Sequence, residues 1–313
     1  MGLTGLRVAV TGASGFCGGA VARAAAGRGA VVVGLGRRPG PVGQHRFWDA
    51  AGDQPDLSGV DIVVHLAAAV GDPAPGAAAR FEAVNVAGTA RLLAAAGGRP
   101  VVWVSSGSVY RPPAGGRPVT EDDPVGGHRN AYARTKAAGE RLALAAGAVV
   151  LRPRAVYGPG DPHLLPRLRR AVRGGTVPLP GPDAPLSLTA VANLADACLA
   201  APGWPAGAYN VADAGPYQRD AAVRAVLAAA TGRPVRVVHV PVRAARLAAA
   251  VATAVAAAGR TEPRLSRYAV EQLARPVVLD LAKAAEQGWR PRESLTGFLA
   301  ALQAGHGCAP TVG

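Results

Sequence analysis

The fold of this chain is decided by the segment LRVAVTGASGFCGGAVARAAA, residues 6–26. Its first part is an apolar run typical of a buried strand, and its last part is Ala-rich and typical of a helix. Gly12, Gly15 and Gly18 lie at the turn between them. Glycines at a turn let a pyrophosphate approach the main chain at the positive end of the following helix. The segment predicts the start of a dinucleotide-binding unit. Glycines that serve packing alone are the simpler alternative.

Short Val-rich runs alternate with longer Ala- and Leu-rich stretches over residues 6–156. Continuous apolar runs separated by helical segments are typical of parallel strands covered on both faces by crossover helices. The predicted fold class is therefore α/β, a doubly wound parallel sheet of the Rossmann type. The expected strands are Arg7–Val10, Val31–Leu35, Asp61–Leu66, Val101–Ser105 and Ala148–Arg152, with a return to the large domain at Ala208–Val211.

The pattern changes after residue 158, where Pro and Gly interrupt the chain and long helical stretches follow. The expected helices are 218–230, 242–258 and 265–273. We expect residues 1–158 and 187–213 to form the dinucleotide-binding domain. Residues 159–186 and 214–313 would then form a smaller, helix-rich substrate-binding region.

The formal net charge of +14 raises the question of a nucleic-acid or membrane-surface partner. Only Lys136 and Lys283 are lysines, and the 32 arginines are scattered along the chain rather than gathered into a block. The three cysteines have no metal-ligand spacing and suit a reducing cytoplasm. The sequence has neither a signal-peptide pattern nor an apolar run of about 20 residues. We expect a cytoplasmic protein with a small-molecule substrate, no nucleic-acid partner, no membrane span and no metal.

The second expected strand ends near Gly36, about 20 residues after the glycine turn. A unit that binds NAD places an acidic residue there, on the adenosine ribose. This chain instead has Gly36 followed by Arg37 and Arg38. A guanidinium group matches a phosphate in charge and geometry, so the pattern favours NADP(H) over NAD. The alternative is that both are ordinary surface arginines of an Arg-rich chain.

Tyr132 and Lys136 are four residues apart, so on a helix their side chains share one face. The ammonium group, together with an oxidised nicotinamide, would lower the pKa of the phenol from about 10 and make proton transfer feasible near neutral pH. This spacing is common by chance, but the chain has only two lysines and six tyrosines. The pair is therefore the strongest catalytic candidate in the sequence.

The run of strand residues 101–104 is followed by Ser105, Ser106 and Ser108. Ligands in open α/β sheets lie outside the carboxyl ends of the strands, so these hydroxyl groups would face the cofactor crevice. One of them could donate a hydrogen bond to a substrate oxygen. The alternative is that the serines satisfy backbone groups of the turn.

With the glycine turn, the serines and the Tyr/Lys pair in this order, the sequence resembles the extended short-chain dehydrogenase/reductases. These form the NAD(P)-dependent epimerase/dehydratase family, which includes 3β-hydroxysteroid dehydrogenase-like members. The resemblance covers nearly the whole chain. Further matching segments are HLAA (65–68), NVAGT (85–89), RPRAVYGPG (152–160), VANLADA (191–197) and GWRP (288–291).

The resemblance implies that Tyr132 is the acid/base, that Lys136 orients the nicotinamide ribose and tunes the tyrosine, and that Ser106 polarises the substrate. It also implies that Asp49 lies near the adenine and that Ala67 lines the cofactor groove. The predicted cofactor-binding residues are Gly12, Ser14, Gly15, Phe16, Gly18, Arg37, Arg38, Asp49, Ala50, Leu66, Ala67, Ala68, Asn85, Ser105, Tyr132, Lys136 and Pro153.

Departures from the family pattern narrow the expected substrate. Sugar-nucleotide members hold the diphosphate with an Asn and an Arg, and the matching positions here are Ala155 and Leu186. The 4,6-dehydratases have an Asp-Glu pair where this chain has Gly107 and Ser108, so elimination of water is not expected. The sequence therefore predicts an NADP(H)-dependent oxidoreductase, ketoreductase- or hydroxysteroid dehydrogenase-like, that interconverts a carbonyl and an alcohol on a small or apolar metabolite. The alternatives are a nicotinamide-dependent epimerase of a sugar or related alcohol, and a non-catalytic NADP(H)-sensing protein.

Two ionisable residues near the expected site have other interpretations. His65 is expected to pack under the cofactor turn rather than to act in catalysis. Arg154 follows the strand expected beside the nicotinamide, where it could reach a substrate carboxylate or carbonyl, or form a surface salt bridge. The Ala-rich helices suit close packing between subunits and are compatible with a homodimer.

Overall fold

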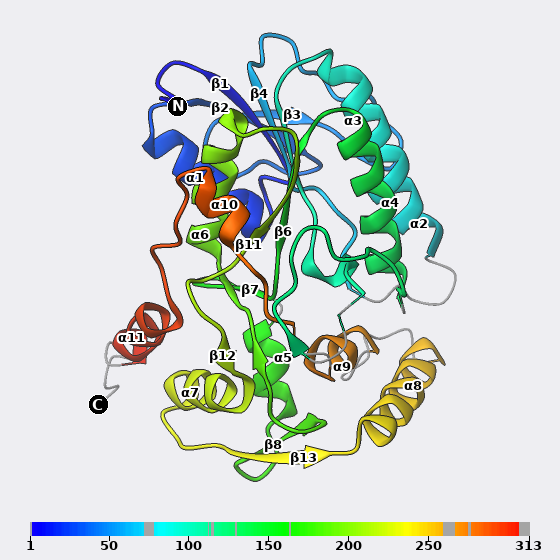
Figure 1. Ribbon diagram of the computed structural model, residues 1–313, viewed down its shortest axis with the longest axis vertical. Helices are drawn as coiled ribbons and strands as arrows, with labels where there is room; N and C mark the ends of the chain where they lie inside the picture. Colours follow the sequence, from blue (N-terminus) through cyan, green and yellow to red (C-terminus); the bar gives the residue numbers. More distant parts are fainter. Residues whose placement is uncertain are drawn as a thin grey trace, which may run out of the picture.

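The computed structural model describes residues 2–71, 78–111, 113, 116–128, 130–162, 164–258, 267–274 and 277–306. Seven strands form a central sheet in which every neighbouring pair is parallel (Figure 1). Their order is β11 (Gly207–Val211), β6 (Val149–Pro153), β5 (Val101–Val104), β4 (Ile62–His65), β1 (Arg7–Thr11), β2 (Val31–Gly36) and β3 (Gln44–Phe47). The order reverses at β1, as in a doubly wound sheet.

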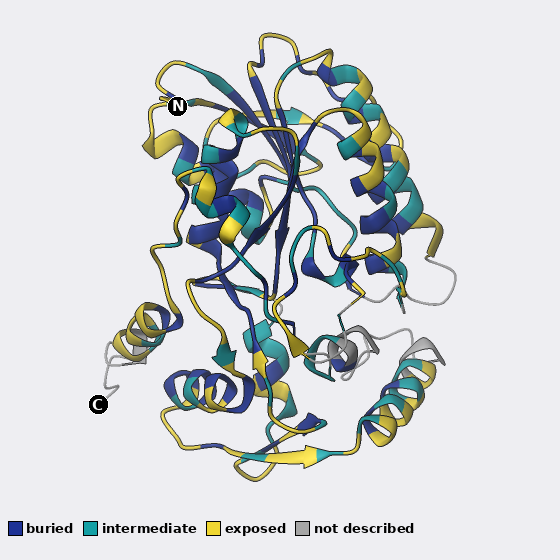
Figure 2. Cartoon of the chain, viewed as in Figure 1, coloured by how far each residue is buried: buried dark blue, intermediate teal, exposed yellow. Residues whose placement is uncertain are grey.

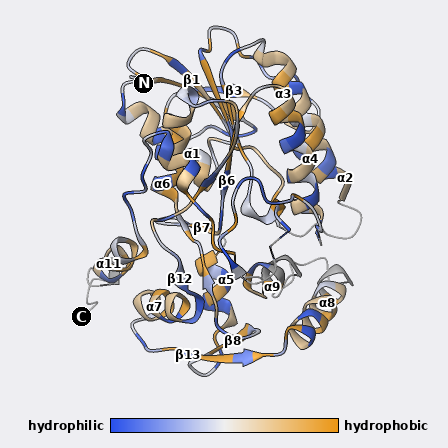
Figure 3. Cartoon of the chain, viewed as in Figure 1, coloured by the Kyte–Doolittle hydropathy of each residue, from blue (hydrophilic) through white to orange (hydrophobic). Residues whose placement is uncertain are grey.

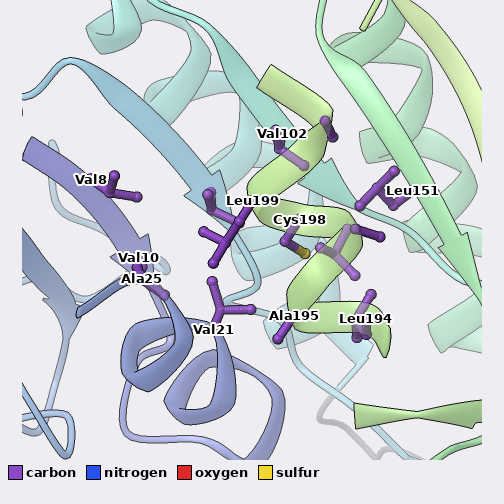
Figure 4. Close-up of a cluster of buried hydrophobic side chains, with 14 of the residues drawn as sticks. Val8, Val10, Val21, Ala25, Val102, Leu151, Leu194, Ala195, Cys198 and Leu199 are labelled. Carbon is purple, nitrogen blue, oxygen red and sulfur yellow. The ribbon is translucent and has the colours of Figure 1, made fainter. Parts of the chain in front are cut away.

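Helices cover both faces of this sheet. The helices α1 (Phe16–Gly27), α6 (Val191–Ala200) and α10 (Ala282–Glu286) lie on one face, and α2 (Ala78–Glu82), α3 (Gly88–Ala96) and α4 (Ala131–Ala145) lie on the other (Figure 1). Val8 and Val10 of β1 pack with Val21 of α1 and Leu199 of α6 (Figure 4). Ala9 belongs to the core of the opposite face. The predicted doubly wound α/β fold is confirmed.

The strands of the sheet are buried because both faces are covered. β4, β5 and β6 are buried along their whole length, and Figure 2 shows the sheet as the most deeply buried part of the chain. The same strands form a hydrophobic band in Figure 3. Their continuous Val-rich sequences follow from burial on two sides, since neither face has to be polar.

We call the part of the chain below the sheet in Figure 1 the lower lobe. Its strands form three pairs: β7 (Val156–Tyr157) with β10 (Thr189–Ala190), β9 (Pro185–Leu186) with β12 (Tyr217–Gln218), and β8 (Thr176–Pro180) with β13 (Arg236–Val240). Its helices are α5 (Leu164–Ala171), α7 (Arg219–Thr231), α8 (Val242–Ala258), α9 (Arg267–Ala274) and α11 (Leu295–His306).

The expected helices at 218–230 and 242–258 match α7 and α8 to within one residue, and α9 covers the described part of the one expected at 265–273. The expected strand at 208–211 is β11, which pairs with β6. The strands β3, β8 and β13 were not predicted. β3 has the sequence QHRF and is largely exposed at the edge of the sheet, so it lacks an apolar run.

Candidate active site

The predicted site residues meet where the carboxyl ends of β1, β4, β5 and β6 come together. The strands end at Thr11, His65, Val104 and Pro153, and because all four are parallel these ends lie at one edge of the sheet. The glycine turn follows β1, the serines follow β5, and α4 brings Tyr132 and Lys136 to the same edge. Ligands bind at this edge in open α/β sheets, near the point where the strand order reverses.

The glycine turn has the geometry of a phosphate cradle. Gly12 has a φ of +67°, and a Cβ atom there would lie 3.1 Å from the main chain of Ala67. A Cβ atom on Gly18 would lie 2.2 Å from the carbonyl oxygen of Gly12. Gly15 is the N-cap of α1 and has no side chain with which to cap the helix. The first N–H groups of α1 therefore point to a surface where an anion can bind, and the turn fits a dinucleotide pyrophosphate.

Thr11 and His65 support the glycine turn on its buried side. The hydroxyl oxygen of Thr11 accepts hydrogen bonds from the N–H groups of Leu66 and Ala67, both at 3.0 Å, and lies 2.7 Å from Nδ1 of His65. Burial, helped by the charge of Lys136, lowers the pKa of the His65 imidazole to about 3. The ring is therefore neutral at pH 7, and with Thr11 as donor to Nδ1 its proton lies on Nε2. His65 packs under the turn, as expected.

Asn85 shapes the groove through the main chain. It lies in the π-helical turn η1 (Ala83–Ala87) and is 1% exposed. Its side-chain oxygen accepts from the N–H of Ala69 at 2.7 Å, and its amide group donates to the carbonyl of Ala69 and to the hydroxyl of Thr135. With its amide engaged in this way, Asn85 fixes the segment of Leu66, Ala67 and Ala68 that follows β4.

The helix α4 places Tyr132 and Lys136 against β5. Asn130 caps the helix by accepting a hydrogen bond from the N–H of Ala133 at 2.8 Å. Tyr132 is 8% exposed. The ammonium group of Lys136 donates to the carbonyl of Val104 at 2.6 Å and lies 3.7 Å from the ring centroid of Trp103. Burial lowers the pKa of Lys136 to about 7, and the carboxylate of Glu140 acts in the opposite direction.

A glycine allows α4 to come this close. A Cβ atom on Gly139 would lie 2.4 Å from the carbonyl oxygen of Asn85 and 2.9 Å from the indole ring of Trp103. The close contact between α4, η1 and β5 is what seats Lys136 over the Trp103 ring.

Ser106 is the N-cap of the short helix η2 (Gly107–Val109). Its hydroxyl oxygen accepts hydrogen bonds from the N–H of Ser108 at 3.2 Å and from the hydroxyl of Ser108 at 2.9 Å. Both serines are half-buried. With its oxygen accepting these bonds, the Ser106 hydroxyl proton is directed to another acceptor, which is the arrangement that polarising a carbonyl oxygen requires.

Sequence reasoning missed a buried ion pair behind these residues. The Glu140 carboxylate accepts from Nη2 of Arg152 at 2.6 Å and from the hydroxyl of Ser105. Nη1 of Arg152 donates to the hydroxyl of Tyr110 at 2.7 Å. The signal in the sequence is the spacing Tyr132, Lys136, Glu140, which puts a carboxylate on the face of α4 that carries the catalytic candidates.

The other predicted residues lie around this centre. Arg37 and Arg38 are exposed directly after β2. Asp49 is half-buried and accepts from the N–H of Ala51, while the carbonyl of Ala50 accepts from Arg91.

Arg154 is 6% exposed. Its aliphatic stem packs against Gly107, and its guanidinium group donates to the carbonyl of Gln272 in α9. Arg154 is thus buried between η2 and the lower lobe.

The described residues offer neither a membrane span nor a metal site. No helix in this part of the chain is both long and apolar enough to span a membrane. No group of three or more His, Cys, Asp or Glu side chains in the same part could hold a metal ion.

The sheet, the glycine cradle and the Tyr/Lys pair at its carboxyl edge define the class: a nicotinamide-dependent enzyme with a Rossmann-type fold. The family model described as "NAD dependent epimerase/dehydratase family" matches residues 8–212. The chain belongs to this family, within the extended short-chain dehydrogenase/reductases.

Three relatives of known activity or structure are informative. A ketoreductase from Stigmatella aurantiaca, named for a 4-hydroxy-2-methyl-3-oxo-4-farnesyl-3,4-dihydroquinoline-1-oxide, is 32% identical over 97% of this chain and 99% of that protein. A 2-alkyl-3-oxoalkanoate reductase from Stenotrophomonas maltophilia is 36% identical, but the match spans 56% of this chain and 58% of that one. A short-chain dehydrogenase/reductase from Agrobacterium tumefaciens with bound NAD has a TM-score of 0.74 at 24% identity, covering 96% of this chain and 97% of that one.

The reductase relatives confirm the expected type of reaction: the chain is an oxidoreductase of the carbonyl/alcohol type. The epimerase alternative fits these relatives less well. The family uses a nicotinamide dinucleotide, so the cofactor class is established as NAD(P).

Proposed function

We propose that this chain is an NADP(H)-dependent ketoreductase in which Ser106, Tyr132 and Lys136 act on the carbonyl group. The observation that carries the proposal is the seat of Lys136: its ammonium group is buried against β5, one helical turn after Tyr132 and beside the segment that bears Ser106. A buried positive charge there stabilises a phenolate on Tyr132, which is what a proton donor leaves behind.

The chemistry divides between the cofactor and the protein. When bound, the nicotinamide supplies a hydride to the carbonyl carbon. Tyr132 gives its phenolic proton to the carbonyl oxygen, and Ser106 donates a hydrogen bond to the same oxygen as negative charge develops there. His65 takes no part, because its ring is neutral at pH 7 and fully buried, and its two nitrogens face the hydroxyl groups of Thr11 and Thr89.

The proposed cofactor preference rests on the end of β2. Gly36 offers no carboxylate to a ribose hydroxyl, and the exposed Arg37 and Arg38 follow it. Their guanidinium groups suit a 2′-phosphate, so we assign NADP(H) rather than NAD. The glycine cradle and the segment 66–68 would hold the rest of the dinucleotide.

The proposed substrate is a ketone with an apolar substituent and no nucleotide. The curated relatives are reductases named for substrates that carry alkyl or farnesyl groups. At the positions where sugar-nucleotide members hold a diphosphate, this chain has Ala155 and Leu186, and Leu186 is buried in an apolar cluster of the lower lobe. We assign substrate binding to residues 159–186 and 214–313, and dinucleotide binding to 1–158 and 187–213. We infer a cytoplasmic enzyme without a nucleic-acid partner, and its Ala-rich helices suit a homodimer.

The test is a turnover assay with a panel of 2-alkyl-3-oxoalkanoates and apolar ketones. We expect NADPH to be consumed in a one-to-one ratio with the alcohol formed. An epimerase would interconvert alcohols with no added cofactor and would leave NADPH unchanged. Tight NADPH binding with no turnover over the whole panel would instead support a sensing protein and contradict the proposal.

A further inference from the structure

The ion pair of Glu140 and Arg152 lies under the segment that carries Ser106. The two side chains are 2% and 4% exposed, so the pair is sealed from water. Arg152 approaches the carboxylate with two nitrogens, Nη2 at 2.6 Å and Nε at 3.2 Å. Burial disfavours the charge of Arg152, but the bonds to Glu140 outweigh it and raise the pKa of the guanidinium group. The Arg152 guanidinium group therefore stays charged beside Glu140.

The pair holds both ends of the catalytic segment. At the start of the segment, the hydroxyl of Ser105 donates to Glu140. At its end, the hydroxyl of Tyr110 accepts from Arg152 at 2.7 Å and donates in turn to Asn210 of β11 at 2.7 Å. Ser106 lies between these two anchors, in a segment of six residues whose termini are fixed to one ion pair.

The same pair is linked to Lys136. Glu140 follows Lys136 by one helical turn on α4, and Lys136 donates to the carbonyl of Val104, the residue directly before Ser105. Two successive residues of the β5 end, Val104 and Ser105, are thus bonded to two successive turns of the helix that carries Tyr132. These two hydrogen bonds set the separation between the end of β5 and α4.

We propose that Glu140, supported by Arg152, is a positioning residue of this active site: it fixes the Ser106 segment opposite Tyr132 and keeps the neighbouring Lys136 positively charged. The proposal rests on the function assigned above. It adds a role for two residues that act through Ser105, Tyr110 and Lys136.

The electrostatic part follows from the surroundings of Lys136. The groups that face it are the Trp103 ring and the Val104 carbonyl from β5, His65 from β4, Tyr132 and Glu140 on α4, and Arg152 from β6 behind Glu140. Glu140 is the negative charge in this set, and it opposes the effect of burial on Lys136. The ammonium form exists below the pKa of Lys136 and is lost as pH rises through it. Without Glu140 that loss occurs at lower pH.

The first experiment measures Lys136 directly and needs no substrate. The chain has two lysines, Lys136 and Lys283, so protein labelled with 13C-lysine gives two side-chain NMR signals, which the Lys136→Met variant assigns. In Glu140→Gln we expect the midpoint of the Lys136 titration to fall by about one pH unit or more, as removal of a close opposite charge requires. The Lys283 signal is the internal reference. An unchanged Lys136 midpoint would overturn the electrostatic role whether or not the chain reduces ketones.

The second experiment measures catalysis in the same variant. We expect kcat of Glu140→Gln to fall by about tenfold to a hundredfold and the alkaline limb of its pH profile to move to lower pH, with KM for NADPH within about twofold. Glu82→Gln is the matched control, because it removes the carboxylate of a surface ion pair to Arg134 of the same helix. An unchanged pH limb and kcat in Glu140→Gln would refute the proposal. An inactive wild-type chain would refute the function assigned above instead.

A double variant covers the case in which Glu140→Gln alone does not fold. Glu140→Gln with Arg152→Gln removes both charges and leaves no uncompensated one in the interior. We expect this protein to fold and to keep the low kcat and the shifted limb. Recovery of the wild-type kcat and pH profile would show that the pair contributes stability only, and would overturn the proposal.

Discussion

The carboxyl edge of the sheet and the lower lobe each contain a buried arginine–carboxylate pair, but the two pairs have different partners. Glu140 and Arg152 bond to Ser105 and Tyr110, at the two ends of the segment that carries Ser106. In the lower lobe, Arg219 is 2% exposed and pairs with the adjacent Asp220.

The arginine of the lower lobe binds main chain. It donates to the carbonyl of Pro180, the last residue of β8, to that of Gly181, which follows it, and to the carbonyl of Leu273 in α9. That pair joins elements of a small lobe, whereas the pair at the sheet edge adjoins a lysine whose pKa burial has lowered to about 7. A buried charge is evidence for a catalytic role only when the groups it contacts can take part in chemistry. The following predictions test this difference between the two regions.

The largest expected effect is on Tyr132. In Tyr132→Phe we expect kcat to fall by about a hundredfold to ten-thousandfold, because the proton donor is gone, while NADPH binding stays near wild type.

Tyr217→Phe is the matched control, because it removes a hydroxyl group in the lower lobe. The Tyr217 phenol donates to Asp213 and accepts from the N–H of Leu295. There we expect the free energy of unfolding to fall by about 1 kcal/mol with kcat largely preserved. Steady-state kinetics and urea unfolding on both variants distinguish a catalytic hydroxyl group from one that only stabilises the fold. Full turnover by Tyr132→Phe would exclude Tyr132 as the proton donor.

The next effect is on the pH dependence of stability, through His65. The folded state holds the pKa of His65 at about 3, below its ordinary value of 6.5, so only the unfolded chain takes up a proton as the pH falls from 6.5 towards 3. Acidification through that range therefore destabilises the fold. Between pH 7 and pH 5 the loss from this residue is about 2 kcal/mol. Urea unfolding at the two pH values should show that the free energy of unfolding falls less from pH 7 to pH 5 in His65→Gln than in the wild type. An equal fall would contradict the lowered pKa of His65.

The smallest expected effect concerns cofactor choice. In Arg37→Ala/Arg38→Ala we expect kcat/KM with NADPH to fall by about tenfold and kcat/KM with NADH to stay the same, because only the 2′-phosphate loses a partner. Arg243→Ala removes an equally exposed arginine from α8 in the lower lobe and should change neither value. A similar loss with both dinucleotides would mean that the two arginines support the fold and not the phosphate.

The sheet was predictable from sequence because its strands are buried on both faces and therefore read as continuous Val-rich runs. The edge strand β3 was not, since an exposed strand needs no apolar residues. β13 is exposed or half-exposed along its whole length and contains no long apolar run. Its partner β8 contains two prolines, which argue against a strand. Local sequence carries little information about strands whose burial is decided by a distant partner.

The candidate site also contains residues that the sequence predicts and residues that it does not. Tyr132 and Lys136 were found because one helix carries both, and Gly12, Gly15 and Gly18 because one turn does. Glu140 and Arg152 are 12 residues apart and meet only when β6 is placed beside β5 and α4 is packed on them. A glutamate on a helix and an arginine near the end of a strand are indistinguishable from surface residues until that packing is known.

Gly139 limits how this enzyme can be stabilised. A glycine inside a helix costs about 1 kcal/mol relative to alanine, so its replacement is an obvious choice for an engineer who wants a more heat-resistant protein. Here the added methyl group would meet the carbonyl oxygen of Asn85 at 2.4 Å and the Trp103 ring at 2.9 Å. Helix α4 would have to retreat from the sheet and take Tyr132 and Lys136 with it. The clash would oppose the gain in helix stability, and the displacement would lower turnover, so a stabilised variant of this enzyme has to be sought elsewhere in the chain.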